Sequence, residues 1–229
     1  MNIDPALYQK YSKEKVDDAV AYLSYKKDPQ PLPKSEDPNY PILYVFRHGQ
    51  TEDNKALVFS GWRDSPLSDA GKEQAKVLAE KLKDKNIHML IASDQIRAVE
   101  TMKIAMSLNK AKDLEIIKDP RIKERCYGDY QGKSKLDLQL ENPEFLHDLR
   151  RSYDFVPPNG ESVKMTVERV RNFLDEVLPH MKQNKINVAV SCHGNSIRGI
   201  RQYFENLTEE ETAEIETPLA KDYAAYNIK

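Results

Sequence analysis

Two histidines that are each followed by glycine are the most chemically suggestive feature of this sequence. They are His48, which follows Arg47, and His193. A neutral imidazole nitrogen can act as a nucleophile near neutral pH, and an arginine guanidinium matches the oxygens of a phosphate. An isolated Arg-His-Gly triplet more often caps a strand beside a surface arginine, because short motifs recur by chance. The triplet therefore indicates phosphate chemistry only together with further residues.

Each of the two histidines follows an apolar run that is expected to form a buried strand. The runs cover residues 41–46 and 186–192, and they are rich in β-branched residues. In an open α/β sheet, ligands bind at the carboxyl ends of the strands. This placement predicts that both histidines lie at the same edge of a sheet.

A third apolar run, 88–92, is followed by a helix whose first turn contains Arg97. The amide groups and the dipole at a helix N-terminus already favour an anion there. A cation at this position therefore indicates a bound anionic ligand. A surface ion pair with Asp94 or Glu100 is the alternative.

The remaining pattern alternates helices with short strands. Residues 121–135 are polar and aperiodic, which is typical of a functional loop. Pro179 is expected to end or bend the clearest amphipathic helix. Other elements are expected as follows: helices near 68–85, 97–106, 161–181, 196–207 and 209–215, short helices interrupted at Pro143 within 136–149, and strands near 115–118 and 223–228.

Composition limits the classes of protein that this chain can represent. It has 229 residues, and its 35 basic and 37 acidic residues give a net charge of -2, which argues against a dedicated nucleic-acid binder. Cys126 and Cys192 have no metal-type spacing and are expected to be buried. No apolar run approaches the length of a membrane span and no hydrophobic signal is apparent, so a cytoplasmic protein without membrane partners is expected.

Residues 1–40 are expected to be an N-terminal helical extension and linker, followed by a single domain over residues 41–229. Asp4 and Pro5 start a predicted helix that reaches about Ser24, and residues 28–33 are expected to form an extended linker. The narrow apolar stripe of this helix favours packing on the domain surface over binding a partner. The sequence leaves the oligomeric state open, and a homo-oligomer is compatible with it.

Taken together, these motifs resemble the histidine phosphatase superfamily and, within it, the cofactor-dependent phosphoglycerate mutases. The resemblance runs from about residue 41 to the carboxyl end. It is carried by Arg47-His48-Gly49, Gly61-Trp62, Pro66-Leu67-Ser68, Ser93-Asp94, Arg97-Ala98, Glu100-Thr101, Glu124-Arg125, Tyr127-Gly128, Gln131-Gly132, Arg150-Arg151-Ser152-Tyr153, Gly160-Glu161-Ser162 and His193-Gly194-Asn195-Ser196. It implies an α/β fold with three α/β/α layers around a mostly parallel mixed sheet.

The resemblance also implies roles for individual residues. His48 would become phosphohistidine, Arg47, Arg97 and His193 would surround the phosphoryl group, and Glu124 would transfer protons. By motif, the substrate-binding positions match Asn54, Ser60, Gly61, Tyr127, Lys135, Arg150, Arg151, Gly194 and Asn195. Neighbouring cations are expected to lower the pKa of His48, and a nearby phosphate with partial desolvation is expected to raise the pKa of Glu124. An arginine pair such as Arg150-Arg151 is otherwise common on solvated surfaces.

The implied activity is the interconversion of 3-phosphoglycerate and 2-phosphoglycerate, primed by 2,3-bisphosphoglycerate and without a metal. Its partner would be a small phosphorylated sugar acid. Thr51 and Asp53 stand where the mutases usually have Ser and Trp, and the last predicted strand lies close to Lys229. The first departure is typical of the broader phosphatases. The second leaves little chain after the last strand to cover the pocket, and a less covered pocket admits water. Both therefore favour the alternative, a phosphatase that uses the same site. An inactive module that binds phosphorylated ligands is the remote alternative.

Overall fold

A five-stranded sheet forms the centre of the computed structural model, which describes residues 3–24 and 31–229. The strand order is β3-β2-β4-β1-β5. The strands are β1 (Ile42–Arg47), β2 (Met89–Ala92), β3 (Ile116–Lys118), β4 (Val188–Cys192) and β5 (Ala224–Asn227). The first four are mutually parallel and β5 runs antiparallel to β1, which confirms the predicted mostly parallel mixed sheet.

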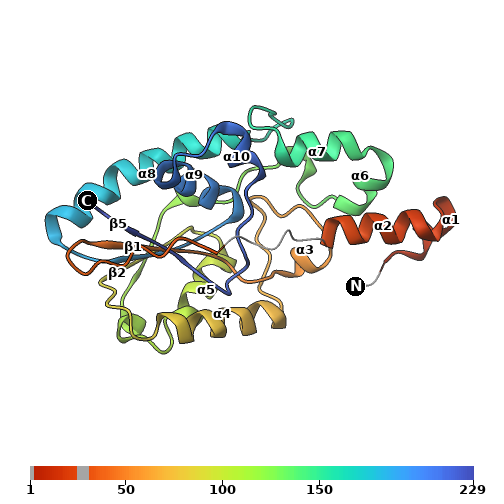
Figure 1. The fold of residues 1–229 in the computed structure, drawn as a ribbon. Helices are drawn as coiled ribbons and strands as arrows, with labels where there is room; N and C mark the ends of the chain where they lie inside the picture. The colour runs from red at the N-terminus through yellow and green to blue at the C-terminus, as the bar shows by residue number, and fades with distance from the viewer. Residues whose placement is uncertain (1–2, 25–30) are drawn as a thin grey trace.

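Helices cover both faces of the sheet, so the predicted three layers are confirmed (Figure 1). On one face lie α4 (Asp69–Leu82) and α5 (Ile96–Ala105), and on the other lie α8 (Val163–Asn184) and α9 (Gly194–Glu205). Alternate residues of β1 serve the two layers, because side chains alternate across a strand. Leu43 packs toward α8 and α9, whereas Tyr44 packs toward α4 and α5.

Short helices and 3-10 turns lie in the connections between these elements. The short helices are α3 (Glu52–Lys55), α6 (Lys135–Glu141), α7 (Pro143–Arg151) and α10 (Glu209–Glu214), with 3-10 turns η1 (Lys110–Asp113), η2 (Pro120–Ile122) and η3 (Gly128–Tyr130). The break between α6 and α7 falls at Pro143, as expected. Cys126 and Cys192 are buried, also as expected.

The N-terminal segment forms two helices rather than the single helix predicted from its pattern. These are α1 (Pro5–Lys10) and α2 (Lys13–Ser24), and the side chain of Ser12 accepts a hydrogen bond from Lys15 N, which favours a new helix start there. Figure 1 shows this pair beside α6, away from the sheet. Val16 of α2 is fully buried in a cluster with Leu136 of α6, so the predicted packing on the domain is confirmed.

Residues 28–30 of the predicted linker 28–33 lie outside the described residues. In the described half, Leu32 is buried in the core and Pro33 O accepts a hydrogen bond from Ala225 N at 2.8 Å. The domain boundary at residue 40 stays a prediction. Within the described residues, no helix is both long and apolar enough to cross a membrane.

Two local features differ from what the sequence pattern alone indicates: Pro179 does not end α8, and the loop after β1 contains a helical turn. Helix α8 continues past Pro179 to Asn184, because Met181 is fully buried in the core and its packing offsets one lost backbone hydrogen bond. The loop after β1 contains the short helix α3, which sequence periodicity could not reveal because it is a single turn. Thr51 caps this turn by accepting a hydrogen bond from Asn54 N at 3.1 Å.

Candidate active site

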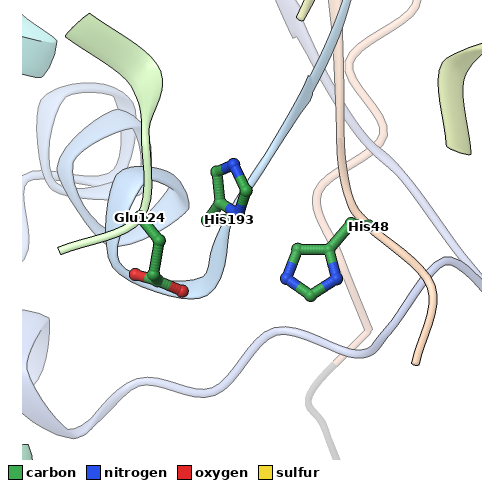
Figure 2. A group of neighbouring side chains, drawn as sticks. All are labelled: His48, Glu124 and His193. Carbon is green, nitrogen blue, oxygen red and sulfur yellow. The ribbon is translucent and has the colours of Figure 1, made fainter. Parts of the chain in front are cut away.

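The parallel strands bring three polar side chains to one edge of the sheet. His48 follows β1, Ser93 follows β2 and His193 follows β4, and β4 lies between the other two strands. The two imidazole rings are 5.0 Å apart between centroids, and Glu124 reaches the same place from the loop after η2. Figure 2 shows the three side chains converging from three different segments. The predicted shared edge for the two histidines is therefore confirmed.

The tautomer of His48 follows from its hydrogen bond to its own neighbour. Its Nδ1 lies 2.7 Å from the carbonyl oxygen of Gly49, and a carbonyl can only accept. Nδ1 therefore carries the proton, and Nε2 is left with a free lone pair. Burial, and then the charges of Arg97 and Arg47, hold the pKa of His48 well below its ordinary value, as predicted from the nearby cations.

His193 has the opposite tautomer. Its Nδ1 accepts a hydrogen bond from Arg97 Nε at 3.2 Å, so the proton is on Nε2, which donates to Ser93 Oγ at 2.6 Å. Burial and then the charge of Arg97 lower the pKa of His193 as well. Both ring nitrogens are thus engaged, and the ring is held in a fixed orientation beside His48.

Of the two arginines at this edge, Arg97 is buried and Arg47 is partly buried, and the protein satisfies their donors only in part. Arg97 donates to the carbonyl oxygens of Gly61 and Arg63 at 2.8 and 2.9 Å. Among the described residues it forms no ion pair, so the alternative of a surface salt bridge is wrong. Arg47 donates to Thr217 O at 3.0 Å, while its buried Nε has no partner in the described part of the chain. Such an unpaired donor is costly, which favours an anionic ligand at this point.

Glu124 differs from the prediction in the direction of its pKa shift. Burial alone would raise the pKa of this carboxyl. The charge of Arg47 and hydrogen bonds from Asn195 Nδ2 at 2.8 Å and Arg125 N at 2.8 Å outweigh the burial, so the pKa lies below its ordinary value. The expected raised pKa took account of a phosphate and of desolvation but not of these donors.

One pocket collects almost all of the predicted site residues. It is lined by Arg47, His48, Asn54, Ser60, Gly61, Arg97, Glu124, Tyr127, Lys135, Arg150, Arg151, Gly194 and Asn195, and His193 lies directly behind His48. Arg150 and Arg151 are partly buried in its wall, so the alternative of a solvated arginine pair is wrong. Burial, followed by the charge of Arg150, lowers the pKa of Lys135 to about 7.

The pocket also contains residues that sequence reasoning missed, namely Phe59, Arg198, Ile215, Glu216 and Thr217. Residues 215–217 belong to the segment between α10 and β5, which has no glycine or histidine motif to attract notice. Only Arg198 had a usable signal, because it follows Asn195 by three residues and so shares its face of α9.

His48, Glu124 and His193 could in principle offer ligand atoms to a metal, because these atoms lie within 4.8 Å of one another. Both nitrogens of His193 are already engaged, and the guanidinium groups of Arg47 and Arg97 face the same space. This environment fits a phosphate better than a cation, and the metal-free site stays a prediction.

Comparison with known proteins shows the family to which this chain belongs. The model of the histidine phosphatase superfamily (branch 1) matches residues 43–227. A 2,3-bisphosphoglycerate-dependent phosphoglycerate mutase of Parvibaculum lavamentivorans is 38% identical over 174 residues, which is 74% of this chain and 82% of that protein. A phosphoglycerate mutase of Schizosaccharomyces pombe is also 38% identical, with the same coverage of both chains.

The fold is also similar to a solved structure of a phosphatase. A mycobacterial glucosyl-3-phosphoglycerate phosphatase superimposes with a TM-score of 0.71 at 24% identity, and the match covers 81% of this chain and 92% of that one. The chain therefore belongs to the histidine phosphatase superfamily and is an enzyme of that superfamily.

Proposed function

We propose that this enzyme is a phosphoglycerate mutase that interconverts 3-phosphoglycerate and 2-phosphoglycerate through a phosphohistidine at His48. The observation that carries this proposal is that the pocket holds further basic side chains besides Arg47 and Arg97. Lys135 and Arg150 lie in the same pocket as His48, which suits a substrate with a carboxylate in addition to its phosphate. The 38% identity to a named mutase supports the same activity.

In this mechanism His48 carries the phosphoryl group between two hydroxyls of the sugar acid. 2,3-Bisphosphoglycerate supplies the phosphoryl group that first primes His48. Glu124 takes the proton from the incoming hydroxyl as the bond between Nε2 and phosphorus breaks. His48 then takes the neighbouring phosphoryl group in line, and Glu124 returns the proton to the leaving oxygen. Arg47 and Arg97 stabilise the charge on the phosphoryl oxygens throughout.

The low pKa of Glu124 is compatible with both proton transfers. A bound phosphate dianion would offset the charges of Arg47 and Arg97, which hold that pKa down. The carboxyl would then be a base before transfer and a competent acid when the leaving oxygen develops charge.

Phosphorus NMR of the purified protein with 3-phosphoglycerate tests the proposal, with and without a trace of 2,3-bisphosphoglycerate and with EDTA throughout. We expect a 2-phosphoglycerate signal that needs the bisphosphate and survives EDTA. His48→Ala should abolish it, with a rate loss of at least about a thousandfold. His180→Ala is the control, because His180 is exposed on α8. A signal that disappears in EDTA would contradict the metal-free mechanism.

A phosphatase that uses the same site is the second candidate, favoured by Asp53 in the first motif and by the phosphatase among the similar folds. The same spectra decide between the two activities. Inorganic phosphate as the only product would replace the mutase with the phosphatase.

A further inference from the structure

The two neighbouring arginines of the pocket are not equivalent. Within the described residues Arg150 donates no side-chain hydrogen bond and forms no ion pair, although it lines the pocket. Arg151 instead forms an ion pair through its Nη2 with the carboxylate of Glu216, and its Nη1 reaches only Ala213 O at 3.5 Å. An anion that approaches Arg151 therefore meets a guanidinium already occupied by a carboxylate of the protein.

The backbone that carries Glu216 is held in place independently of its side chain. Three successive carbonyl oxygens accept hydrogen bonds from three arginines. These bonds run from Arg198 Nε to Ile215 O at 3.1 Å, from Arg201 Nη1 to Glu216 O at 3.4 Å and from Arg47 Nη1 to Thr217 O at 3.0 Å. The Glu216 side chain can therefore leave Arg151 by rotating, while residues 215–217 keep their positions.

Glu216 is also chemically suited to compete with an anionic ligand. It lines the pocket, and about 34% of its side chain is exposed, so a ligand can reach the ion pair. Burial acts against its charge, but Arg151, Arg198 and Arg47 lower the pKa of Glu216 to about 2. The carboxylate is therefore ionised at every pH at which the protein is expected to work.

We propose that Glu216 is a specificity-determining residue that acts as an internal competitor for the second anionic group of the substrate. In the resting pocket its carboxylate occupies Arg151, and a substrate with a phosphate and a carboxylate must displace it. A ligand with a single phosphate binds at Arg47 and Arg97 without disturbing the ion pair. The inference rests on the substrate-binding role of Arg150 and Arg151 that the family resemblance implies, and not on mutase turnover.

Equilibrium binding tests this role most directly. The probes are 3-phosphoglycerate and inorganic phosphate, measured by calorimetry in a His48→Ala background so that no turnover interferes. Glu216→Gln keeps the shape of the side chain and removes its charge. We expect it to raise the preference for 3-phosphoglycerate over phosphate about fivefold, the upper range for a partly exposed ion pair. Glu210→Gln is the matched control, because it removes a charge from the exposed surface of the neighbouring helix α10, outside the pocket.

A double-mutant cycle with Arg151→Gln tests whether Glu216 changes the ligand preference through Arg151. In that background the Glu216 substitution should no longer change the preference. A preference that stays the same or falls in Glu216→Gln would overturn the inference, because Glu216 would then orient Arg151 or be a structural partner only. An undiminished effect without Arg151 would also overturn it. Failure of the mutase reaction in the NMR experiment would leave this binding ratio measurable, so the two proposals fail separately.

Discussion

At the scale of single residues, three hydrogen bonds decide which imidazole can be the nucleophile. The carbonyl of Gly49 fixes the proton of His48 on Nδ1, while Arg97 and Ser93 occupy both nitrogens of His193. Only His48 therefore presents a free lone pair toward the pocket. The two histidines look alike in the sequence, and the difference between them comes from their neighbours.

Glu124→Gln separates proton transfer from the other duties of this side chain. Glutamine can keep the hydrogen bond that Glu124 accepts from Arg125 N, but it cannot donate or accept the catalytic proton. We expect kcat with 3-phosphoglycerate to fall by about 10²–10⁴. Formation of phosphohistidine from p-nitrophenyl phosphate should fall much less, because nitrophenolate leaves without a proton. Equal losses with both substrates in rapid-quench experiments would show that Glu124 acts by binding instead.

At the scale of elements, the N-terminal helices pack against the outer side of elements that line the pocket. Helix α2 packs on α6, and α6 begins with Lys135, which lines the pocket. Leu23 near the end of α2 packs on the cluster around Phe59, another lining residue. The family match begins only at residue 43, so α1 and α2 lie outside the matched region.

Val16→Ala measures how strongly α2 is attached. The removed methyl groups are fully buried, so we expect the free energy of unfolding to fall by about 2 kcal/mol, measured by urea denaturation. Val77→Ala is the matched control, because Val77 is 48% exposed on helix α4 and should change stability little. Equal effects of the two substitutions would mean that α2 does not contribute its packing to the folded domain.

At the scale of the whole molecule, a nearly neutral protein has one pocket with an excess of basic over acidic residues. The formal net charge is only -2, yet six arginine and lysine residues line the pocket, against the two acids Glu124 and Glu216. The basic lining residues are Arg47, Arg97, Lys135, Arg150, Arg151 and Arg198. Holding these charges together is unfavourable without an anion, so the pocket favours an anionic ligand.

The buried histidines should make the stability of the whole protein depend on pH. The pKa of His48 and that of His193 both lie well below the ordinary value of 6.5, so the unfolded state binds more protons below that pH. The free energy of unfolding should therefore fall as the pH drops from 7 to 5, by up to about 1.4 kcal/mol per pH unit for each histidine. His193→Gln should reduce this slope, whereas His180→Gln should not. A stability that is flat over this range in urea titrations would contradict the buried neutral state.

The sequence alone determined the elements and the chemical inventory of this protein. Strands and most helices could be predicted, because apolar periodicity is a local property of the chain, whereas the residues of the candidate site were named from the resemblance to the histidine phosphatases. Helix α8 shows the limit of such reasoning, since a proline predicts a local break while burial of Met181 is a tertiary effect.

Only the tertiary structure decided the pKa of Glu124 and the placement of Glu216 in the pocket. The low pKa of Glu124 depends on the charge of Arg47 and on a hydrogen bond from Asn195, and both residues are distant from it in sequence. Glu216 reaches Arg151 only because the segment before β5 crosses the carboxyl edge of the sheet. Charge and hydrogen bonding act through space, so a one-dimensional pattern that lists the groups cannot say which of them neutralise one another.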